Sequence, residues 1–316
     1  MPAFKAAFNG YSVEFSPFSE TLLAVATSQN FGIIGNGRQY VLQLHPSGGI
    51  AELCSFDTAD GLYDCTWAED NEHILVSASA DGSVKVWDTA LPRHANPIRS
   101  FEEHGHEVNS VDWNLVRKDC FLSSAWDDTA KLWAIDAPRS LRTFAEHSYC
   151  VYTAVWNPRH ADVFLTASGD CTLRVWDVRD PHASLVIPGH QLEILACDWS
   201  KYNECVLVSG SVDKTIKVWD VRNPRREMSS LQGHGYAVRR VKFSPHHASV
   251  IASCSYDMTV CMWDYMAPED ALLARYDHHT EFAIGIDMSP HVEGLLASTA
   301  WDETVYVWQH GMDPRA

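Results

Sequence analysis

The sequence of 316 residues predicts an all-β fold of similar small sheets, because three features recur along it. Tryptophan returns with a period near 44 residues, and each of these tryptophans stands six residues after an aspartate. A histidine precedes five of the six aspartates by 23 residues, and a serine or threonine precedes all six by four residues. Between these positions lie short apolar or alternating runs bounded by Asn, Pro, Gly and Asp, which are typical of strands joined by turns. The recurring tryptophans are Trp87, Trp133, Trp176, Trp219, Trp263 and Trp308.

A seventh, weaker unit stands upstream of these six. Its segment Phe15-Ser-Pro17 matches Phe243-Ser-Pro245, and residues 36–42 occupy the place of the aspartate-to-tryptophan segment. Strings such as Asp170-Cys-Thr-Leu-Arg-Val-Trp-Asp177 resemble the WD repeat, whose unit is a four-stranded blade of a β-propeller. We therefore predict one domain over residues 1–316, a seven-bladed WD-repeat β-propeller.

The first two blades and the two chain ends depart from the repeat. Ala6 stands in place of the histidine and Asn36 in place of the aspartate of blade one, and Thr58 replaces the histidine of blade two, so we expect these blades to be looser. After Trp308 only eight residues remain, too few for a turn and another full strand. Residues 2–5 precede blade one by the offset that outer strands keep elsewhere. We expect this amino-terminal segment to pair with the last blade and remove two open sheet edges.

Composition and charge restrict the classes of function. The chain has 41 acidic and 24 basic side chains, and this formal charge of −17 disfavours binding to nucleic acid or insertion into an anionic membrane. No apolar run reaches the roughly 18 residues of a membrane span, and the amino terminus lacks a signal-peptide pattern. The nine cysteines form no CxxC pair and are interpreted as reduced, mostly packed thiols. We expect a soluble protein of the cytosol or nucleus that needs no cofactor and no metal.

The spaced Ser or Thr, His and Asp invite comparison with a hydrolase triad. An enzyme needs one triad, whereas this set occurs five times. We interpret it as a buried hydrogen-bond network that satisfies polar groups whose burial would otherwise cost roughly 1 to 3 kcal/mol each. Histidine pairs such as His246 and His247 lack partners at zinc-site spacing and are interpreted as loop or surface residues. We thus predict a protein that is not an enzyme. The network set is His104, Ser123, Asp127, Trp133, His147, Thr166, Asp170, Trp176, His190, Ser209, Asp213, Trp219, His234, Ser253, Asp257, Trp263, His279, Ser298, Asp302 and Trp308.

Two tryptophans outside the repeat, Trp126 and Trp301, immediately precede a turn aspartate. In a propeller this turn shares a rim with the histidine-bearing loop, so these side chains should stand around the mouth of the central channel. Aromatic side chains on a rim are candidate partner anchors, although each can instead pack on a neighbouring blade. The starts of the innermost strands add an apolar and acidic mixture, which only Arg239 interrupts with a positive charge. The predicted peptide-binding residues are Glu107, Trp126, Tyr152, Glu193, Leu195, Tyr256 and Trp301.

Several strings go beyond the generic repeat, among them Phe8-Asn-Gly-Tyr-Ser-Val13, Gly233-His-Gly-Tyr-Ala-Val238 and Tyr276-Asp-His-His-Thr-Glu-Phe282. In these the chain closely resembles the seventh-peroxin family, the peroxisomal import receptors for type 2, amino-terminal targeting signals, and is most similar to its plant form. The resemblance extends over residues 1–316. It implies a soluble receptor that binds cargo in the cytosol, joins a co-receptor of the long fifth-peroxin type, reaches docking proteins at the peroxisomal membrane and recycles.

The resemblance also implies a ligand. The family's signal reads Arg or Lys, Leu, five variable residues, His or Gln, then Leu or Ala, and its fixed positions share one face of a helix roughly 13 Å long. We expect helix-in-groove recognition. Tyr152, Leu195, Trp126 and Trp301 would receive the leucines, while the carboxylates of Glu107 and Glu193 would face the cation.

Two alternatives remain open. Trp176-Asp-Val-Arg179 and Trp219-Asp-Val-Arg222 resemble the box of WD-repeat substrate receptors in cullin-type ubiquitin ligases. The same residues are also expected from the WD repeat itself, because Trp-Asp is common in this repeat and Arg is common in the turn that follows. The second alternative is a general protein-interaction scaffold.

Overall fold

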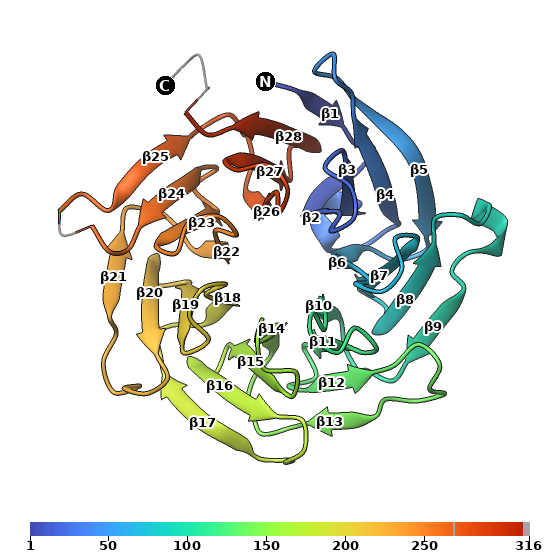
Figure 1. Ribbon diagram of the computed structural model, residues 1–316. Coiled ribbons are helices and arrows are strands. Elements are labelled where there is room, and N and C mark those ends of the chain that lie inside the picture. The colour runs from blue at the N-terminus through green and yellow to red at the C-terminus, as the bar shows by residue number, and fades with distance from the viewer. Residues whose placement is uncertain (268, 312–316) are drawn as a thin grey trace.

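The computed structural model describes residues 1–267 and 269–311 and places seven four-stranded antiparallel sheets around a central channel (Figure 1). This confirms the predicted seven-bladed propeller. We number the blades one to seven by the order of their innermost strands. These are β2 (Asn9–Phe15), β6 (Leu62–Trp67), β10 (Val108–Trp113), β14 (Val151–Trp156), β18 (Ile194–Trp199), β22 (Val238–Phe243) and β26 (Ala283–Met288).

Burial decreases from the middle of each blade to its outside. The second strands are almost wholly buried, because the faces of neighbouring blades pack against them on both sides. They are β3 (Leu22–Ser28), β7 (Ile74–Ser79), β11 (Phe121–Ala125), β15 (Val163–Ser168), β19 (Val206–Ser211), β23 (Val250–Ser255) and β27 (Leu295–Ala300). The third strands carry the repeat tryptophans in blades two to seven, and Leu42 takes that place in blade one. They are β4 (Gly37–Leu44), β8 (Ser83–Asp88), β12 (Ala130–Trp133), β16 (Thr172–Asp177), β20 (Thr215–Asp220), β24 (Val260–Asp264) and β28 (Thr304–Gln309).

The outermost strands alternate between buried and exposed side chains, as expected for a sheet edge at the rim of the disc. They are β5 (Ile50–Thr58), β9 (Arg99–Glu102), β13 (Arg142–Phe144), β17 (Ala183–Pro188), β21 (Ser229–Gln232), β25 (Leu272–Tyr276) and β1 (Ala3–Lys5). Two short 3₁₀ turns complete the described elements, η1 (Asn30–Gly32) and η2 (Arg93–Ala95). No helix in the described ranges is long and apolar enough to cross a membrane.

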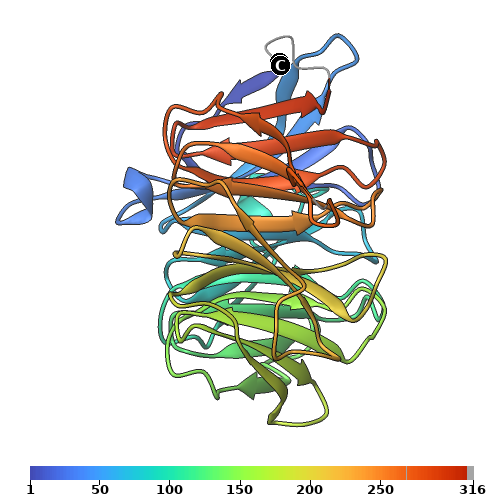
Figure 2. The same ribbon diagram turned by 90° about the vertical axis from the view of Figure 1, so that its left-hand side faces the viewer.

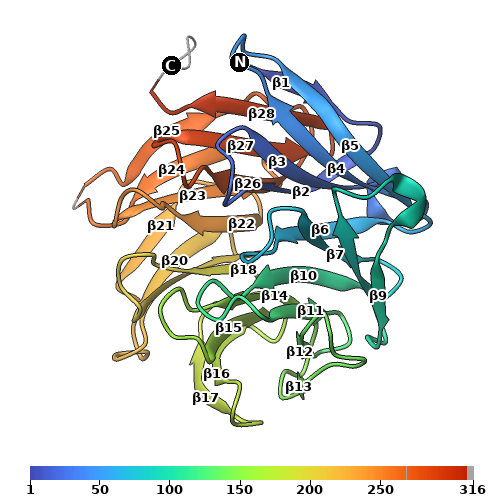
Figure 3. The same ribbon diagram turned by 45° about the vertical axis from the view of Figure 1, so that its right-hand side comes forward.

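The ring closes through the amino terminus, as the sequence predicts. Strand β1 pairs antiparallel with β28, with Ala3 opposite Tyr306 and Lys5 opposite Thr304 (Figure 3). The last blade therefore takes its outer strand from the start of the chain and three strands from the end. This pairing removes the two sheet edges that an open ring would expose.

The recurring polar residues of blades three to seven join within each blade as a buried chain of hydrogen bonds. In blades three to seven the histidine Nδ1 lies 2.8–2.9 Å from the aspartate, and its Nε2 lies 2.7–2.8 Å from the serine or threonine hydroxyl. The tryptophan N–H of blades three to six donates to the same hydroxyl at 2.7–2.9 Å. Burial alone would raise the pKa of Asp127, but hydrogen bonds from His104 and Thr129 hold it well below its ordinary value.

Two blades depart from this arrangement in instructive ways. The indole N–H of Trp308 in blade seven has no hydrogen-bond partner among residues 1–267 and 269–311, and Ser298 is contacted instead by His278 at 3.2 Å. Trp308 is thus an exception to the predicted network, and His278 lies buried in the loop that follows β25. In blade two the missing histidine is replaced by Gln39 of blade one, which accepts a 2.8 Å hydrogen bond from Ser77. We predicted that blade two would be looser because Thr58 replaces its histidine. The buried amide of Gln39 instead fills the place of that histidine beside Ser77.

Candidate functional site

One irregularity repeated in every blade builds the mouth of the channel. Near the start of each innermost strand the pairing register skips one residue, which is a β-bulge. A bulge turns the extra side chain away from the sheet, so one residue per blade points into the mouth. The seven bulged residues line a single cavity of about 520 Å³, and they are Tyr11, Tyr63, Asn109, Tyr152, Leu195, Arg239 and Ile284.

A second ring stands above the bulges, formed by the residues that precede the turn aspartates. A main-chain hydrogen bond from each of these residues fixes it beside the neighbouring loop, as from Trp126 to Glu107 at 3.0 Å and from Trp301 to Phe282 at 3.1 Å. Tyr256 is held in the same way by Ala237. The aromatic side chains of this ring therefore have a fixed place at the rim.

All seven residues predicted from the sequence line this cavity: Glu107, Trp126, Tyr152, Glu193, Leu195, Tyr256 and Trp301. The two tryptophans differ in their surroundings. Trp126 is 40% exposed, and its ring meets that of Tyr152 edge-on with 6.5 Å between the ring centroids. Trp301 is only partly exposed, because it packs among the rings of Phe31, Phe282 and other aromatic residues. The alternative expectation, packing on a neighbouring blade, thus describes Trp301 better than Trp126.

The mouth also contains an aromatic wall that the sequence reasoning missed. Segment 30–36 projects from one face of the disc, where η1 is seen in blue in Figure 2. The hydroxyl of Tyr11 donates to the carbonyl of Phe31, and that of Tyr63 donates to the carbonyl of Gly32, each at 2.7 Å. Phe31 then lies 5.4 Å from Trp301, and Ile33 beside it is 84% exposed. The available signal was the unusual run Asn30-Phe-Gly-Ile-Ile-Gly-Asn-Gly37.

Charge is unevenly distributed around the mouth. Glu107 and Glu193 stand on blades three and five, and the hydroxyl of Tyr152 donates to the Glu193 carboxylate at 3.2 Å. Burial and the Glu193 charge raise the pKa of Tyr152, so this hydroxyl keeps its proton at neutral pH. Arg239 on blade six is the single cation among the cavity-lining residues of the described chain. The mouth is therefore apolar over most of its wall, with acidic and basic groups at different blades.

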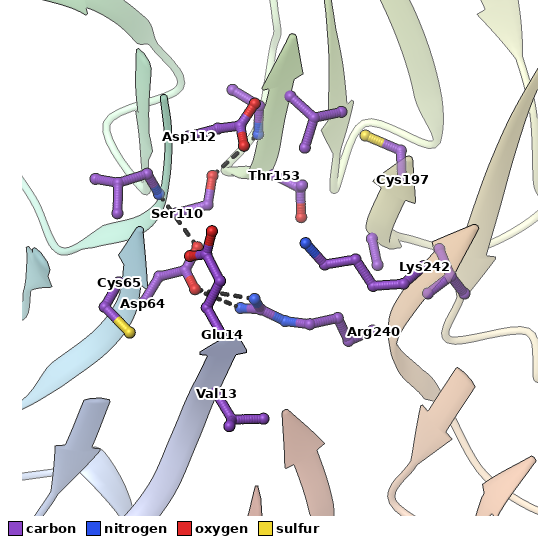
Figure 4. A pocket seen from close by; sticks show the side chains of 15 residues that line it. Val13, Glu14, Asp64, Cys65, Ser110, Asp112, Thr153, Cys197, Arg240 and Lys242 are labelled. Carbon is purple, nitrogen blue, oxygen red and sulfur yellow. Dashed lines mark hydrogen bonds and ion pairs between the residues drawn. The ribbon is translucent and has the colours of Figure 1, made fainter. Parts of the chain in front are cut away.

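Below the mouth the channel becomes narrow and densely charged (Figure 4). The cavity there measures only about 30 Å³, close to the volume of one water molecule. Arg240 makes two 2.9 Å contacts with Asp64, while the side chains of Glu14 and Lys242 extend into the same space. Burial raises the pKa of Asp112 to about 7, although the Trp156 N–H and nearby lysines act in the opposite direction. The channel below the mouth is therefore too narrow to admit a peptide.

Other sequence candidates lie away from this cavity. The guanidinium groups of Arg179 and Arg222 are bound by the aspartates of their own turns, Asp177 and Asp220. Among residues 1–267 and 269–311, no group of three or more His, Cys, Asp or Glu side chains is arranged to hold a metal ion. The hydroxyl residues of the five triad-like sets are all fully buried, so a substrate has no access to them.

Comparison with known proteins identifies both the repeat and its relatives. The repeat family described as WD domain, G-beta repeat matches residues 51–88 and 95–134, and the EIPR1 beta-propeller family matches residues 139–263. The chain is 67% identical over its whole length to peroxisome biogenesis protein 7 of Arabidopsis thaliana, which it also covers completely. It is 63% identical to the peroxisomal targeting signal 2 receptor of Dictyostelium discoideum, over 91% of this chain and 90% of the relative.

A more distant relative agrees over a shorter stretch. The human peroxisomal targeting signal 2 receptor is 48% identical over 42% of this chain and 41% of its own length. The two full-length matches bear out the resemblance found in the sequence. The chain belongs to the family of peroxisomal targeting signal 2 receptors that includes peroxisome biogenesis protein 7.

Proposed function

We propose that this protein is a cargo receptor that binds the amino-terminal type 2 peroxisomal targeting signal as a short amphipathic helix lying across the mouth of the channel. Its two full-length relatives are named as a peroxisome biogenesis protein and as a receptor for this signal. The observation that carries the proposal is the cavity of about 520 Å³, with its apolar wall and its two carboxylates. Such a surface suits a helix with leucines on one face and a cation at one end.

The proposed contacts follow from the two rings. Trp126, Tyr152 and Leu195 form one apolar side of the mouth, and Trp301 with Tyr256 forms the other. The leucine side chains of the signal would be removed from water when they pack against these walls. Burying one leucine contributes about 1.5–3 kcal/mol to the binding free energy. Glu107 and Glu193 would attract the cationic residue, and this contribution acts on specificity and encounter rate more than on affinity.

We extend the proposal to the partners and the location of the receptor. It would bind cargo in the cytoplasm, join a co-receptor of the long fifth-peroxin type and travel to docking proteins at the peroxisome. Ile33 and Ile34 next to the mouth are 84% and 74% exposed, which leaves an apolar surface for such a co-receptor. The proposal includes no catalysis, and the complete burial of the repeated hydroxyls supports that part of it.

The proposal is tested by fluorescence anisotropy with a labelled nine-residue signal peptide. The control peptide carries aspartate at both fixed apolar positions, and each titration is repeated with a fragment of the co-receptor. We expect saturable binding of the signal peptide and at least about tenfold weaker binding of the control, from the loss of two buried leucines. Equal affinity for the two peptides in both conditions would contradict the proposal.

The ubiquitin-ligase alternative makes a different prediction. It requires Arg179 and Arg222 for contact with an adaptor, yet both guanidinium groups are bound by aspartates of their own turns. The double variant Arg179→Ala with Arg222→Ala should therefore retain signal-peptide binding. Loss of adaptor co-purification in this variant, with no peptide binding by the unmodified protein, would favour the alternative instead.

A further inference from the structure

One side chain of the mouth is not explained by leucine and cation recognition. Arg239 is the bulged residue of blade six, and it is only 7% exposed. Within the described residues it makes no hydrogen bond and has no carboxylate within 4.0 Å of its nitrogens. Most of this side chain is covered by protein, so its charge is largely removed from bulk water with no carboxylate beside it to compensate. Its guanidinium nitrogens are not enclosed, so an acceptor that enters the mouth can reach them.

The next residue in the chain shows what a satisfied arginine looks like here. Arg240 points to the other side of the strand and contacts Asp64 twice at 2.9 Å. Arg239 instead faces the cavity. Tyr11 and Tyr152 line the same cavity. Burial raises the pKa of both tyrosines, and the positive charge of Arg239 acts in the opposite direction. Five N–H donors of this side chain are therefore available to an acceptor that enters the mouth.

The positions of the blades indicate how a ligand that supplies an acceptor to Arg239 would be oriented across the mouth. Strand β10, which Glu107 precedes, and strand β22, which carries Arg239, lie on opposite sides of the channel in Figure 1. Glu193 is closer in the ring, but its carboxylate accepts from Tyr152 of blade four. The mouth thus presents a negative group on one side and a positive group on the other. A helix has the complementary polarity, because its first N–H groups and its last carbonyl groups are unpaired and carry partial charges of opposite sign.

We propose that Arg239 is the docking point for the carbonyl end of the bound signal helix, and that it fixes the direction in which the peptide lies across the mouth. This inference rests on the proposed function. The acceptors are the unpaired main-chain oxygens of the last helical turn, which an arginine fork can bind in pairs. The amino-terminal end of the peptide, with its cation, then lies toward Glu107.

The test is a thermodynamic cycle between the protein and the end of the peptide. Two nine-residue signal peptides, both acetylated at the amino end, finish in either a free carboxylate or a carboxamide. A carboxylate beside a buried arginine forms a charge-assisted hydrogen bond, so the unmodified protein should bind the carboxylate peptide about tenfold more tightly. Arg239→Met should reduce this ratio to near one, whereas Arg239→Lys should keep part of it.

The controls separate the possible failures. Arg159→Met, on an exposed loop between β14 and β15, should leave the ratio unchanged. A ratio near one in the unmodified protein, or an equal ratio in the Arg239→Met variant, would overturn the inference while leaving peptide binding intact. If the methionine variant does not fold, the unmodified protein and Arg239→Lys still decide. Absence of saturable binding of either peptide would remove the proposed function and this inference with it.

A third peptide identifies the source of the oxygen atoms. It ends in a carboxamide and carries glutamate at its central variable position. If this glutamate, and not the terminal carboxylate, produces the gain in affinity that depends on Arg239, the arginine binds a cargo side chain and the proposed docking of the helix end is overturned. We expect no gain from the glutamate.

Discussion

The hydroxyl of Tyr152 donates a 3.2 Å hydrogen bond to the carboxylate of Glu193 and so joins blades four and five at the mouth of the channel. Both residues stand at the start of an innermost strand or just before it, where the bulges direct side chains into the cavity. The tyrosine therefore holds the carboxylate in place before any peptide arrives. Among the described residues, the carboxylate of Glu107 accepts no such hydrogen bond, and the imidazole of its neighbour His106 lies 4.0 Å away.

Glu193→Gln should weaken binding of the signal peptide about threefold to fivefold, because a partly exposed ion pair contributes up to about 1 kcal/mol. Tyr152→Phe should have a smaller electrostatic effect, since it removes only the group that orients the carboxylate. Titrations at low and high salt measure both effects. A peptide with glutamine in place of its first cationic residue serves as the control and should not distinguish Glu193→Gln from the unmodified protein. Equal losses for both peptides would contradict the assignment.

Trp126→Ala should weaken peptide binding at least tenfold without lowering the melting temperature, because a 40% exposed indole contributes more to the ligand than to the core. Tyr202→Ala is a matched control, since this aromatic side chain is 44% exposed on a loop outside the cavity. Calorimetry and a thermal melt give the two quantities. Unchanged affinity for Trp126→Ala would remove this residue from the site.

Trp301→Ala should affect binding and stability together. Its ring packs against Phe31 at 5.4 Å and Phe282 at 5.2 Å, so truncation opens a cavity in the aromatic wall and loosens segment 30–36. A loss of about 2–4 kcal/mol of unfolding free energy is expected from a large-to-small change of this kind. If the variant loses peptide binding but keeps the full unfolding free energy, the prediction is wrong, because the ring would then contribute to binding and not to the fold.

Trp219→Phe should cost more unfolding free energy than Trp308→Phe, although both replace a buried indole at the same repeat position. Trp219 donates a 2.9 Å hydrogen bond to Ser209, whereas the Trp308 N–H has no partner in the part of the chain that the structure describes. The difference should be about 1 kcal/mol, the net contribution of one hydrogen bond. Urea denaturation of the two variants measures it, and equal costs would show that this bond adds nothing to the blade.

Asp112→Asn should flatten the pH dependence of stability. The folded-state pKa of Asp112 is raised to about 7, mainly by burial, whereas an unfolded aspartate ionises near pH 4. The folded protein therefore holds a proton that the unfolded chain has lost, and unfolding free energy falls as the pH rises from 4 to 7. Between pH 5 and 7 the unmodified protein should lose about 2 kcal/mol relative to the asparagine variant.

Urea denaturation at pH 5, 6 and 7 checks this result. The asparagine side-chain oxygen can still accept the 2.7 Å hydrogen bond from the main-chain N–H of Trp156. The substitution therefore removes the charge and little else. Asp70→Asn, on an exposed loop, controls for the loss of one negative charge. A gap between the Asp112→Asn variant and the unmodified protein that stays constant over this range would contradict the buried ionisation.

The fold was predictable because its signals are local and repeated. Each aspartate-to-tryptophan segment specifies a turn and a third strand, and seven such units leave little choice of architecture. The repeat also located the ring of Trp126 and Trp301, since a fixed position in the unit is a fixed position on the rim. The replacement of the blade-two histidine by Gln39 was not predictable, because it depends on a contact between neighbouring blades.

The remainder of the site depended on geometry that the repeat does not encode. Tyr11 and Phe31 of blade one meet Trp301 of blade seven only when the ring closes, and Tyr63 of blade two packs beside Tyr11. The charged channel follows a visible signal, the polar residue one place before the end of six of the seven innermost strands, as in Glu14, Asp112 and Lys242. The change of sign at Arg239 was visible too, but its burial without a partner required the structure.

The most direct test of the account is the position of the bound signal. A nine-residue signal peptide with a photoreactive group in place of one fixed leucine is bound, irradiated and mapped by mass spectrometry. We predict labelling of the mouth, at residues 107–109, 126, 150–152, 193–195, 282–284 or 301, and competition by unmodified peptide. Labelling confined to the loops at the opposite end of the innermost strands, such as residues 114–118, 200–204 or 244–247, would contradict the central claim.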